Sequence, residues 1–96
     1  MDRFAQFAIA AAQEAMAQAD LKIDSSNCDR VGVVIGTGIG GIGTIIDSYE
    51  TMKERGPERV SPFLVPMMIS DSAAGILAIR TGARGPNMSL ATACAT

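Results

Sequence analysis

The fold is decided by the stretch VGVVIGTGIGG, residues 31–41. Its first half is a run of β-branched residues bounded by glycine. Such a run predicts a short β-strand that is apolar on both faces and lies within a covered sheet. Its second half is crowded with glycines, which predicts a loop whose backbone passes close to another backbone or to a ligand.

The same glycines match the spacing of a dinucleotide-binding loop, because positions 36, 38 and 41 follow a strand and precede a helix. That fold needs a second strand ending in an acidic residue about twenty positions further on. Glu58 lies near that distance, but residues 51–59 are polar and contain a glycine–proline pair, so no strand fits there. No lysine follows the glycines at the spacing of a phosphate-binding loop either. The sequence therefore favours a close backbone contact over nucleotide binding.

Hydrophobic periodicity on both sides of this stretch predicts the other elements. Asp2 is the expected N-cap of the first helix and Gly82 the expected C-cap of the last one. The expected elements are, in order, a helix over residues 3–19, the strand over residues 30–36, a helix that spans residues 42–52 and stops at residues 55–57, an extended loop over residues 60–66, a helix over residues 67–81 and a strand over residues 88–94. This α–β–α–α–β order predicts an α/β fold with parallel or mixed strands.

The composition excludes several classes of function. The 96 residues contain no histidine and two cysteines. Without histidine the chain holds no Ser–His or Cys–His catalytic pair. Without a cluster of lysine and arginine it has no basic surface for binding nucleic acid. Its apolar runs are too short to span a membrane. Cys28 and Cys94 lie too far apart to suggest a disulfide framework or a zinc site, so a reducing cytoplasm is the expected location.

The chain is unusually apolar for its length. Hydrophobic residues make up 48% of it and charged residues only 19%, so little polar surface is left to cover a core. The chain also stops two residues after Cys94. We therefore expect a piece of a larger globular body, which by itself self-associates through exposed apolar surface.

Cys94 stands in a run of small residues, Ala91–Thr96. A cysteine in an apolar strand is usually an inert small hydrophobe, and residue type by itself favours that interpretation. The alternative is a nucleophile at a strand-to-helix turn, where a helix N-terminus activates the thiol and N–H groups bind an oxyanion. Cys28 lies in a polar connector that offers no such setting.

Three motifs, taken in order, resemble the β-ketoacyl-[acyl-carrier-protein] synthase family, in particular its type II elongating condensing enzymes. They are VVIGTGIGG at residues 33–41, VSPFLVP at 60–66, and RGPN at 84–87 followed by TACAT at 92–96. The opening MDRF resembles the same family, so the resemblance covers essentially the whole chain. It implies a partial thiolase-like α/β fold, with residues 1–96 forming an internal part of the N-terminal β-ketoacyl synthase domain that ends just after the nucleophile.

The resemblance also implies an acyltransferase activity in fatty-acid elongation. Cys94 matches the nucleophile that receives an acyl chain from acyl carrier protein as a thioester, and its N–H would supply one oxyanion donor. A malonyl-carrier thioester then loses CO₂, and the resulting carbanion attacks the acyl-cysteine. The family's assisting histidines have no counterpart here, so the chain by itself is expected not to condense. No cofactor and no metal are implied.

Three further residues acquire roles from the resemblance. Ile39 matches a residue that lines the acyl tunnel. Leu64 matches a position, often phenylalanine, that reaches across a homodimer interface into the partner's tunnel, and Met68, which lies close by in the sequence, is expected to line the tunnel too. The strand ending at Cys94 resembles the one that pairs across the twofold axis. Asp71 stands where asparagine is common in the family, so acyl-chain length is left open.

Two alternatives to the fatty-acid enzyme remain. A condensing domain of a polyketide synthase shares the motifs and differs in its acyl substrate. A non-catalytic, truncated dimer partner is the other alternative, and Cys94 argues against it because such partners commonly lack the nucleophile.

Overall fold

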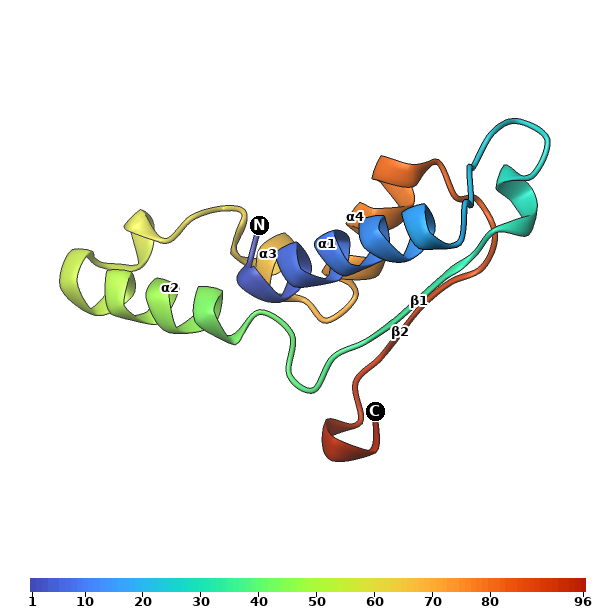
Figure 1. Cartoon of the computed structure of the whole chain (residues 1–96). Helices are drawn as coiled ribbons and strands as arrows, with labels where there is room; N and C mark the ends of the chain where they lie inside the picture. The colour runs from blue at the N-terminus through green and yellow to red at the C-terminus, as the bar shows by residue number, and fades with distance from the viewer.

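The computed structural model describes residues 1–96, in which two short parallel strands form the sheet (Figure 1). Strand β1 (Val33–Gly36) pairs with β2 (Asn87–Leu90), and Gly36 lies opposite Leu90 at the last register position. Helix α4 (Ser72–Thr81) packs on this sheet, and helix α1 (Arg3–Gln18) packs against α4. The chain is therefore an α/β protein with a small parallel sheet, as the order of the expected elements predicted.

The first two helices and their boundaries follow the sequence closely. Helix α1 begins after Asp2, whose carboxylate accepts a hydrogen bond from the N–H of Phe4, as expected of an N-cap. Helix α2 (Ile42–Arg55) ends at Gly56, which adopts a φ of +89°. The C-cap predicted at Gly82 is also confirmed, because this residue is left-handed and its N–H donates to the carbonyl of Ala78.

The prediction of a single helix over residues 67–81 is wrong. The prediction of an extended loop over residues 60–66 is wrong at its end, where residues 64–66 are helical. The chain instead forms helix α3 (Leu64–Met68), an extended residue at Ile69, and then α4. Pro66 fits into α3 because it stands in the first turn, where its missing N–H removes no helical hydrogen bond. A residue of the sheet fixes the chain at the break after α3, since the hydroxyl of Ser89 in β2 donates to the carbonyl of Ser70 at 2.9 Å.

The second strand is shorter than the sequence predicted, which expected residues 88–94. It ends at Leu90 because its partner β1 ends at Gly36, the residue opposite, and residues beyond Leu90 have no strand to pair with. The sheet was expected to be covered on both faces around residues 31–36, but the structure covers only one face. Val33 is buried on that face, whereas the next side chain, Val34, is 62% exposed.

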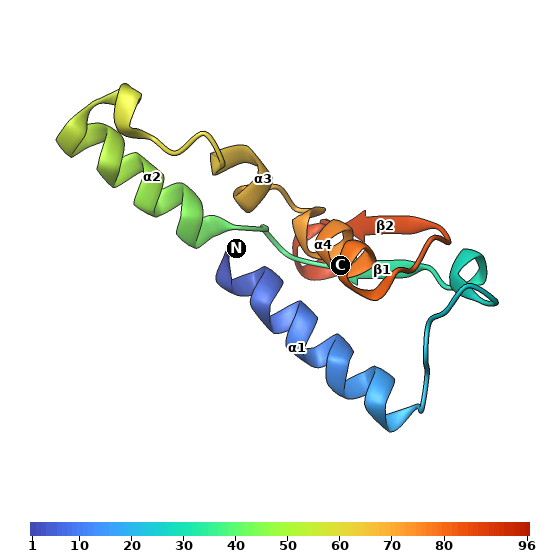
Figure 2. The same ribbon diagram turned by 90° about the horizontal axis from the view of Figure 1, so that it is seen from above.

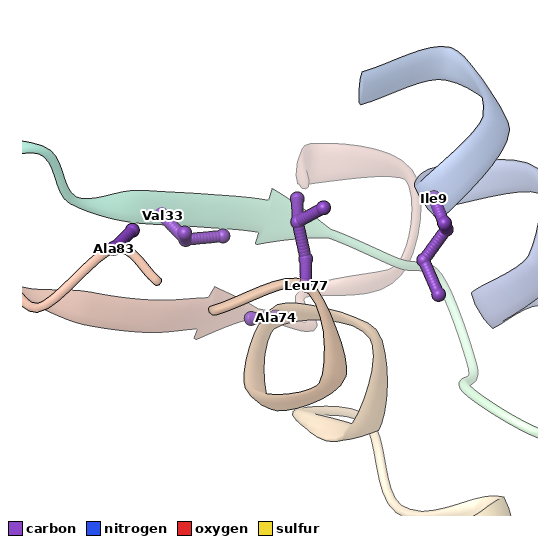
Figure 3. Packing of buried hydrophobic residues seen from close by; sticks show 5 residues of the cluster. All are labelled: Ile9, Val33, Ala74, Leu77 and Ala83. Carbon is purple, nitrogen blue, oxygen red and sulfur yellow. The ribbon is translucent and has the colours of Figure 1, made fainter. Parts of the chain in front are cut away.

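A small apolar core lies where the sheet, α4 and α1 meet. Figure 3 shows Leu77 of α4 between Val33 of β1 and Ile9 of α1, and Ala74 and Ala83 complete the cluster. The molecule extends over 50 × 29 × 21 Å, so much of it lies beyond this core. Large apolar side chains are exposed on most elements, which supports the expectation of self-association. None of the helices has the length and apolar content that a membrane crossing requires.

Helices α2 and α3 pack against each other and form an arm, residues 42–68, that extends away from the core (Figures 1 and 2). The arm is tied to α1 by Asp2. One oxygen of its carboxylate accepts the N–H of Phe4, and the other accepts both the N–H of Thr44, at 2.9 Å, and the Thr44 hydroxyl. Burial raises the pKa of Asp2, but the hydrogen bonds from Thr44 and Phe4 lower it by more, so the net pKa lies below the ordinary 3.8.

Replacing Asp2 by alanine is expected to lower the free energy of unfolding by about 1 to 2 kcal/mol at neutral pH, because the carboxylate caps two helices. The Asp2 pKa is lower in the folded than in the unfolded chain. Its contribution is therefore complete above pH 3.8 and disappears as the pH falls through the lowered value. Urea unfolding followed by circular dichroism over a descending pH series measures this difference. The exposed Asp47→Ala serves as the control, and an Asp2→Ala deficit that persists undiminished at the lowest pH contradicts the prediction.

Candidate active site

Two segments leave the carboxyl edge of the sheet side by side. Because the strands are parallel, the loop after β1 and the segment after β2 emerge at the same edge, where open α/β sheets commonly bind ligands. The N–H of Thr37 donates to the carbonyl of Leu90 at 2.9 Å. A side-chain carbon added at Gly36 would lie 2.6 Å from the Cγ2 of Thr96. The C-terminal turn therefore lies against the start of the glycine loop.

Cys94 lies in this turn, a single turn of 3₁₀ helix at Ala93–Ala95. The turn is closed by the N–H of Ala95, which donates to the carbonyl of Thr92, and by the hydroxyl of Thr96, which accepts the N–H of Thr92 at 2.7 Å. Ala93 has a φ of +51°, a left-handed conformation that costs a non-glycine residue roughly 1–2 kcal/mol. Such strain often marks a functional turn. Nothing in the sequence indicated it, since alanine is not a residue that favours positive φ.

The thiol of Cys94 is exposed and unpaired. Cys94 lies beyond the end of a strand and at the sheet edge, the kind of position expected of a nucleophile. Cys28, by contrast, is half-buried in a separate turn after the first helix. The role of Cys94 as nucleophile stays a prediction.

An apolar groove of about 230 Å³ runs between α2 and α3 on the arm. It brings together two of the three residues predicted to contact an acyl chain, Leu64 and Met68. Sequence reasoning did not assign the other side chains of the groove, although three of them belong to the apolar stripe that predicted α2. These unassigned residues are Ile45, Ser48, Tyr49, Met52 and Val60.

The third predicted residue, Ile39, does not line this groove. It lies on the glycine loop and is 68% exposed. Cys94 does not line the groove either. Figures 1 and 2 both show the C-terminal turn beside the sheet and the groove-forming helices on the arm. The glycine loop connects the two regions, since it begins beside the Cys94 turn and ends at the first residue of α2.

The prediction that the glycines allow a close backbone approach is confirmed. The N–H of Gly41 donates to the carbonyl of Met68 at 2.9 Å, so the loop lies directly against the end of α3. Gly40 adopts a φ of +90°, which an L side chain rarely does, and its N–H donates to the hydroxyl of Thr37. The loop is thus fixed to the sheet edge at one end and to the groove wall at the other.

Comparison with known proteins gives consistent results. The family model described as the N-terminal domain of beta-ketoacyl synthase matches residues 1–96. A 3-oxoacyl-[acyl-carrier-protein] synthase 2 from Staphylococcus aureus is 52% identical over 96 residues, which are 100% of this chain and 24% of that protein. The protein of the same name from Synechocystis sp. is 50% identical over 95 residues, 99% of this chain and 23% of that protein.

A solved structure described as the ishigamide ketosynthase/chain length factor superposes with a TM-score of 0.56. It is 31% identical in sequence, and the superposition covers 62% of this chain and 17% of that one. The chain thus spans about a quarter of the length of the curated relatives it matches.

Proposed function

The chain belongs to the β-ketoacyl synthase family, whose N-terminal domain it matches over residues 1–96, and from this membership we propose that it carries the nucleophile of a 3-oxoacyl-[acyl-carrier-protein] synthase. The observation that carries the proposal is the exposed Cys94 thiol in a strained turn at the carboxyl edge of the sheet. The sequence around it is 52% identical to such a synthase. The structural neighbour supports assigning the α/β unit to a partial thiolase-like fold.

The proposed first step is acyl transfer to Cys94. Its Sγ attacks the carbonyl carbon of an acyl-carrier thioester, and the carbonyl electron pair moves onto oxygen. The N–H of Cys94 is proposed as one donor to that oxyanion. When the carbonyl re-forms, the bond to the carrier sulfur breaks, and the carrier leaves as a thiol with the proton that Cys94 gave up. The product is an acyl-cysteine thioester.

The second step forms the new carbon–carbon bond. A malonyl-carrier thioester releases CO₂, and the carbanion left behind attacks the acyl carbon on Cys94. The Cys94 thiolate is released and takes up a proton, and the product is a 3-oxoacyl-carrier thioester. In the family two histidines assist this step, and the chain contains none. We therefore assign only the first step to residues 1–96.

We propose that Ile39 lines the acyl tunnel of its own chain, and that Leu64, with Met68 beside it, reaches across the dimer interface into the tunnel of a second copy; both side chains stand on the apolar groove between α2 and α3. Nearly all the residues that line the groove are apolar or aromatic, which suits a hydrocarbon chain because its burial removes apolar surface from water. Acyl carrier protein and a second copy of the chain are the proposed macromolecular partners. The unpaired outer edge of β2 supports pairing with a second copy. The cytoplasm is the proposed location.

The test is direct transfer of an acyl group from dodecanoyl-[acyl-carrier-protein] to the chain. Intact-mass measurement is expected to show one added dodecanoyl group, removable by hydroxylamine as a thioester is, and peptide mapping is expected to place it on Cys94. Free dodecanoic acid, whose hydroxyl is too poor a leaving group for transfer to a thiol, is the control. Absence of any adduct after prolonged incubation, with the chain folded by circular dichroism, contradicts the proposed function.

One observation favours a second candidate, the condensing domain of a polyketide synthase, namely the similarity to a ketosynthase/chain length factor structure at 31% identity. The 52% identity to a 3-oxoacyl-[acyl-carrier-protein] synthase supports the fatty-acid enzyme more strongly. The two differ in the acyl substrate. Faster transfer from a polyketide-type β-ketoacyl-carrier thioester than from dodecanoyl-carrier would favour the second candidate.

A further inference from the structure

Thr96 connects the Cys94 turn to the end of β1 through the two branches of one side chain. Its hydroxyl accepts the N–H of Thr92 at 2.7 Å, and this bond spans the turn that contains Cys94. Its methyl carbon Cγ2 lies where an added Cβ at Gly36 would approach it to 2.6 Å. Both branches leave the same Cβ, so a single χ1 angle orients them together. A rotation that moves the methyl away from Gly36 therefore also takes the hydroxyl away from Thr92.

Gly36 leaves the space beside which this methyl lies. It is the last residue of β1, and its φ is not among the positive values that favour glycine. Its own chain neighbours aside, Thr96 is the only residue that a Cβ added at Gly36 would meet within 4 Å. Glycine at this position therefore serves the contact with Thr96 and not a backbone conformation.

The conformation of the turn decides where Cys94 directs its reactive atoms. Ala93, just before it, has a φ of +51°, and a residue keeps such a conformation only while surrounding contacts hold it. Two of these contacts are backbone hydrogen bonds, from the N–H of Ala95 to the carbonyl of Thr92 and from the N–H of Thr96 to the carbonyl of Ala93. The third is the Thr96 hydroxyl. Of the three, the Thr96 side chain is the one that also contacts β1.

We infer that Thr96 is a positioning residue for the nucleophile, and that it holds the Cys94 turn against the space left by Gly36. The inference rests on the proposed function, in that Cys94 is taken to receive the acyl group. Acyl transfer needs the Sγ and the N–H of Cys94 at one thioester carbonyl, the Sγ at the carbon and the N–H at the oxygen. Alkylation by iodoacetamide needs only an accessible Sγ, which displaces iodide. A turn without the Thr96 contact should therefore keep alkylation and lose acyl transfer.

The first test removes the hydroxyl of Thr96. All variants carry Cys28→Ser, so that Cys94 is the single thiol. Thr96→Val is expected to slow transfer from dodecanoyl-[acyl-carrier-protein] about tenfold, equivalent to about 1.4 kcal/mol, and to leave the rate of iodoacetamide alkylation within about twofold. Thr51→Val is the matched control, because the Thr51 hydroxyl donates to a carbonyl within α2, that of Asp47.

The second test moves the methyl group from one side of the contact to the other. Gly36→Ala is expected to slow acyl transfer as Thr96→Val does, because the new Cβ displaces the Thr96 side chain and with it the hydroxyl. Adding Thr96→Ser to Gly36→Ala removes the obstructing methyl and keeps the hydroxyl. The double variant is therefore expected to recover most of the rate, a rescue that a general loss of stability would not give.

Intact-mass measurement over time gives both rates, and circular dichroism verifies the fold. A folded Thr96→Val that transfers at the unmodified rate, or that loses transfer and alkylation by the same factor, overturns the inference and leaves the proposed function intact. A Gly36→Ala defect that Thr96→Ser does not repair overturns it as well, and this pair decides the matter if Thr96→Val does not fold. If the Cys28→Ser parent is alkylated but takes up no dodecanoyl group, the proposed function fails and the inference fails with it.

Discussion

Replacing Cys94 by serine is expected to lower the initial rate of acyl transfer from dodecanoyl-[acyl-carrier-protein] by at least about a hundredfold, because an unactivated hydroxyl is a far weaker nucleophile than a thiolate. The turn itself should survive, since its hydrogen bonds come from Thr92, Ala95 and Thr96 and none involves the sulfur. The loss should therefore report chemistry and not unfolding. Intact-mass measurement over time gives the rate, and circular dichroism verifies the fold.

Cys28→Ser provides the matched control, because it removes the other thiol of the chain while leaving the sheet edge untouched. This variant is expected to acquire the dodecanoyl group at the rate of the unmodified chain. Transfer to Cys94→Ser at an undiminished rate, or an adduct that maps to Cys28, would mean that the exposed thiol at the sheet edge is not the nucleophile. The proposed acyltransferase role of residues 1–96 would then fall.

Replacing Leu77 by alanine is expected to destabilise the chain by about 2 to 5 kcal/mol, the range for removing a buried leucine side chain. Leu77 is 6% exposed and lies between β1 and α1 in a cluster of only five buried residues (Figure 3). A domain of ordinary stability has only about 5 to 15 kcal/mol of net free energy. The substitution should therefore remove a large part of it, which urea unfolding followed by circular dichroism measures.

Ile79→Ala is the control for this prediction, because Ile79 lies two residues further along the same helix and is 83% exposed. Both substitutions replace a branched aliphatic residue by alanine in α4. The exposed one is expected to change the free energy of unfolding by less than about 0.5 kcal/mol. Equal urea midpoints for the two variants would show that the cluster around Leu77 does not hold the sheet to the helices.

Several features of the site could be predicted from the sequence because they depend on neighbouring residues. The glycine content of the loop was enough to predict a close backbone approach, although not that its partner is Met68. Leu64 and Met68 were placed near an acyl chain by resemblance, and the structure brings them to one groove. Ile39 lies outside that groove and is exposed on the glycine loop, and its place in the acyl tunnel stays a prediction.

The sequence by itself determined the α/β class, the helices expected over residues 3–19 and 42–52, the N-cap at Asp2 and the helix stop at residues 55–57, because hydrophobic periodicity and capping act within a few residues. Only the tertiary structure decided where the last helix breaks, where the second strand stops and which walls form the groove. Each of these depends on contacts between distant segments. Ser89 holds the carbonyl of Ser70, the end of β1 limits β2, and Gly41 meets Met68. Local patterns carry no information about such partners, so the fold decides them when it brings the segments together.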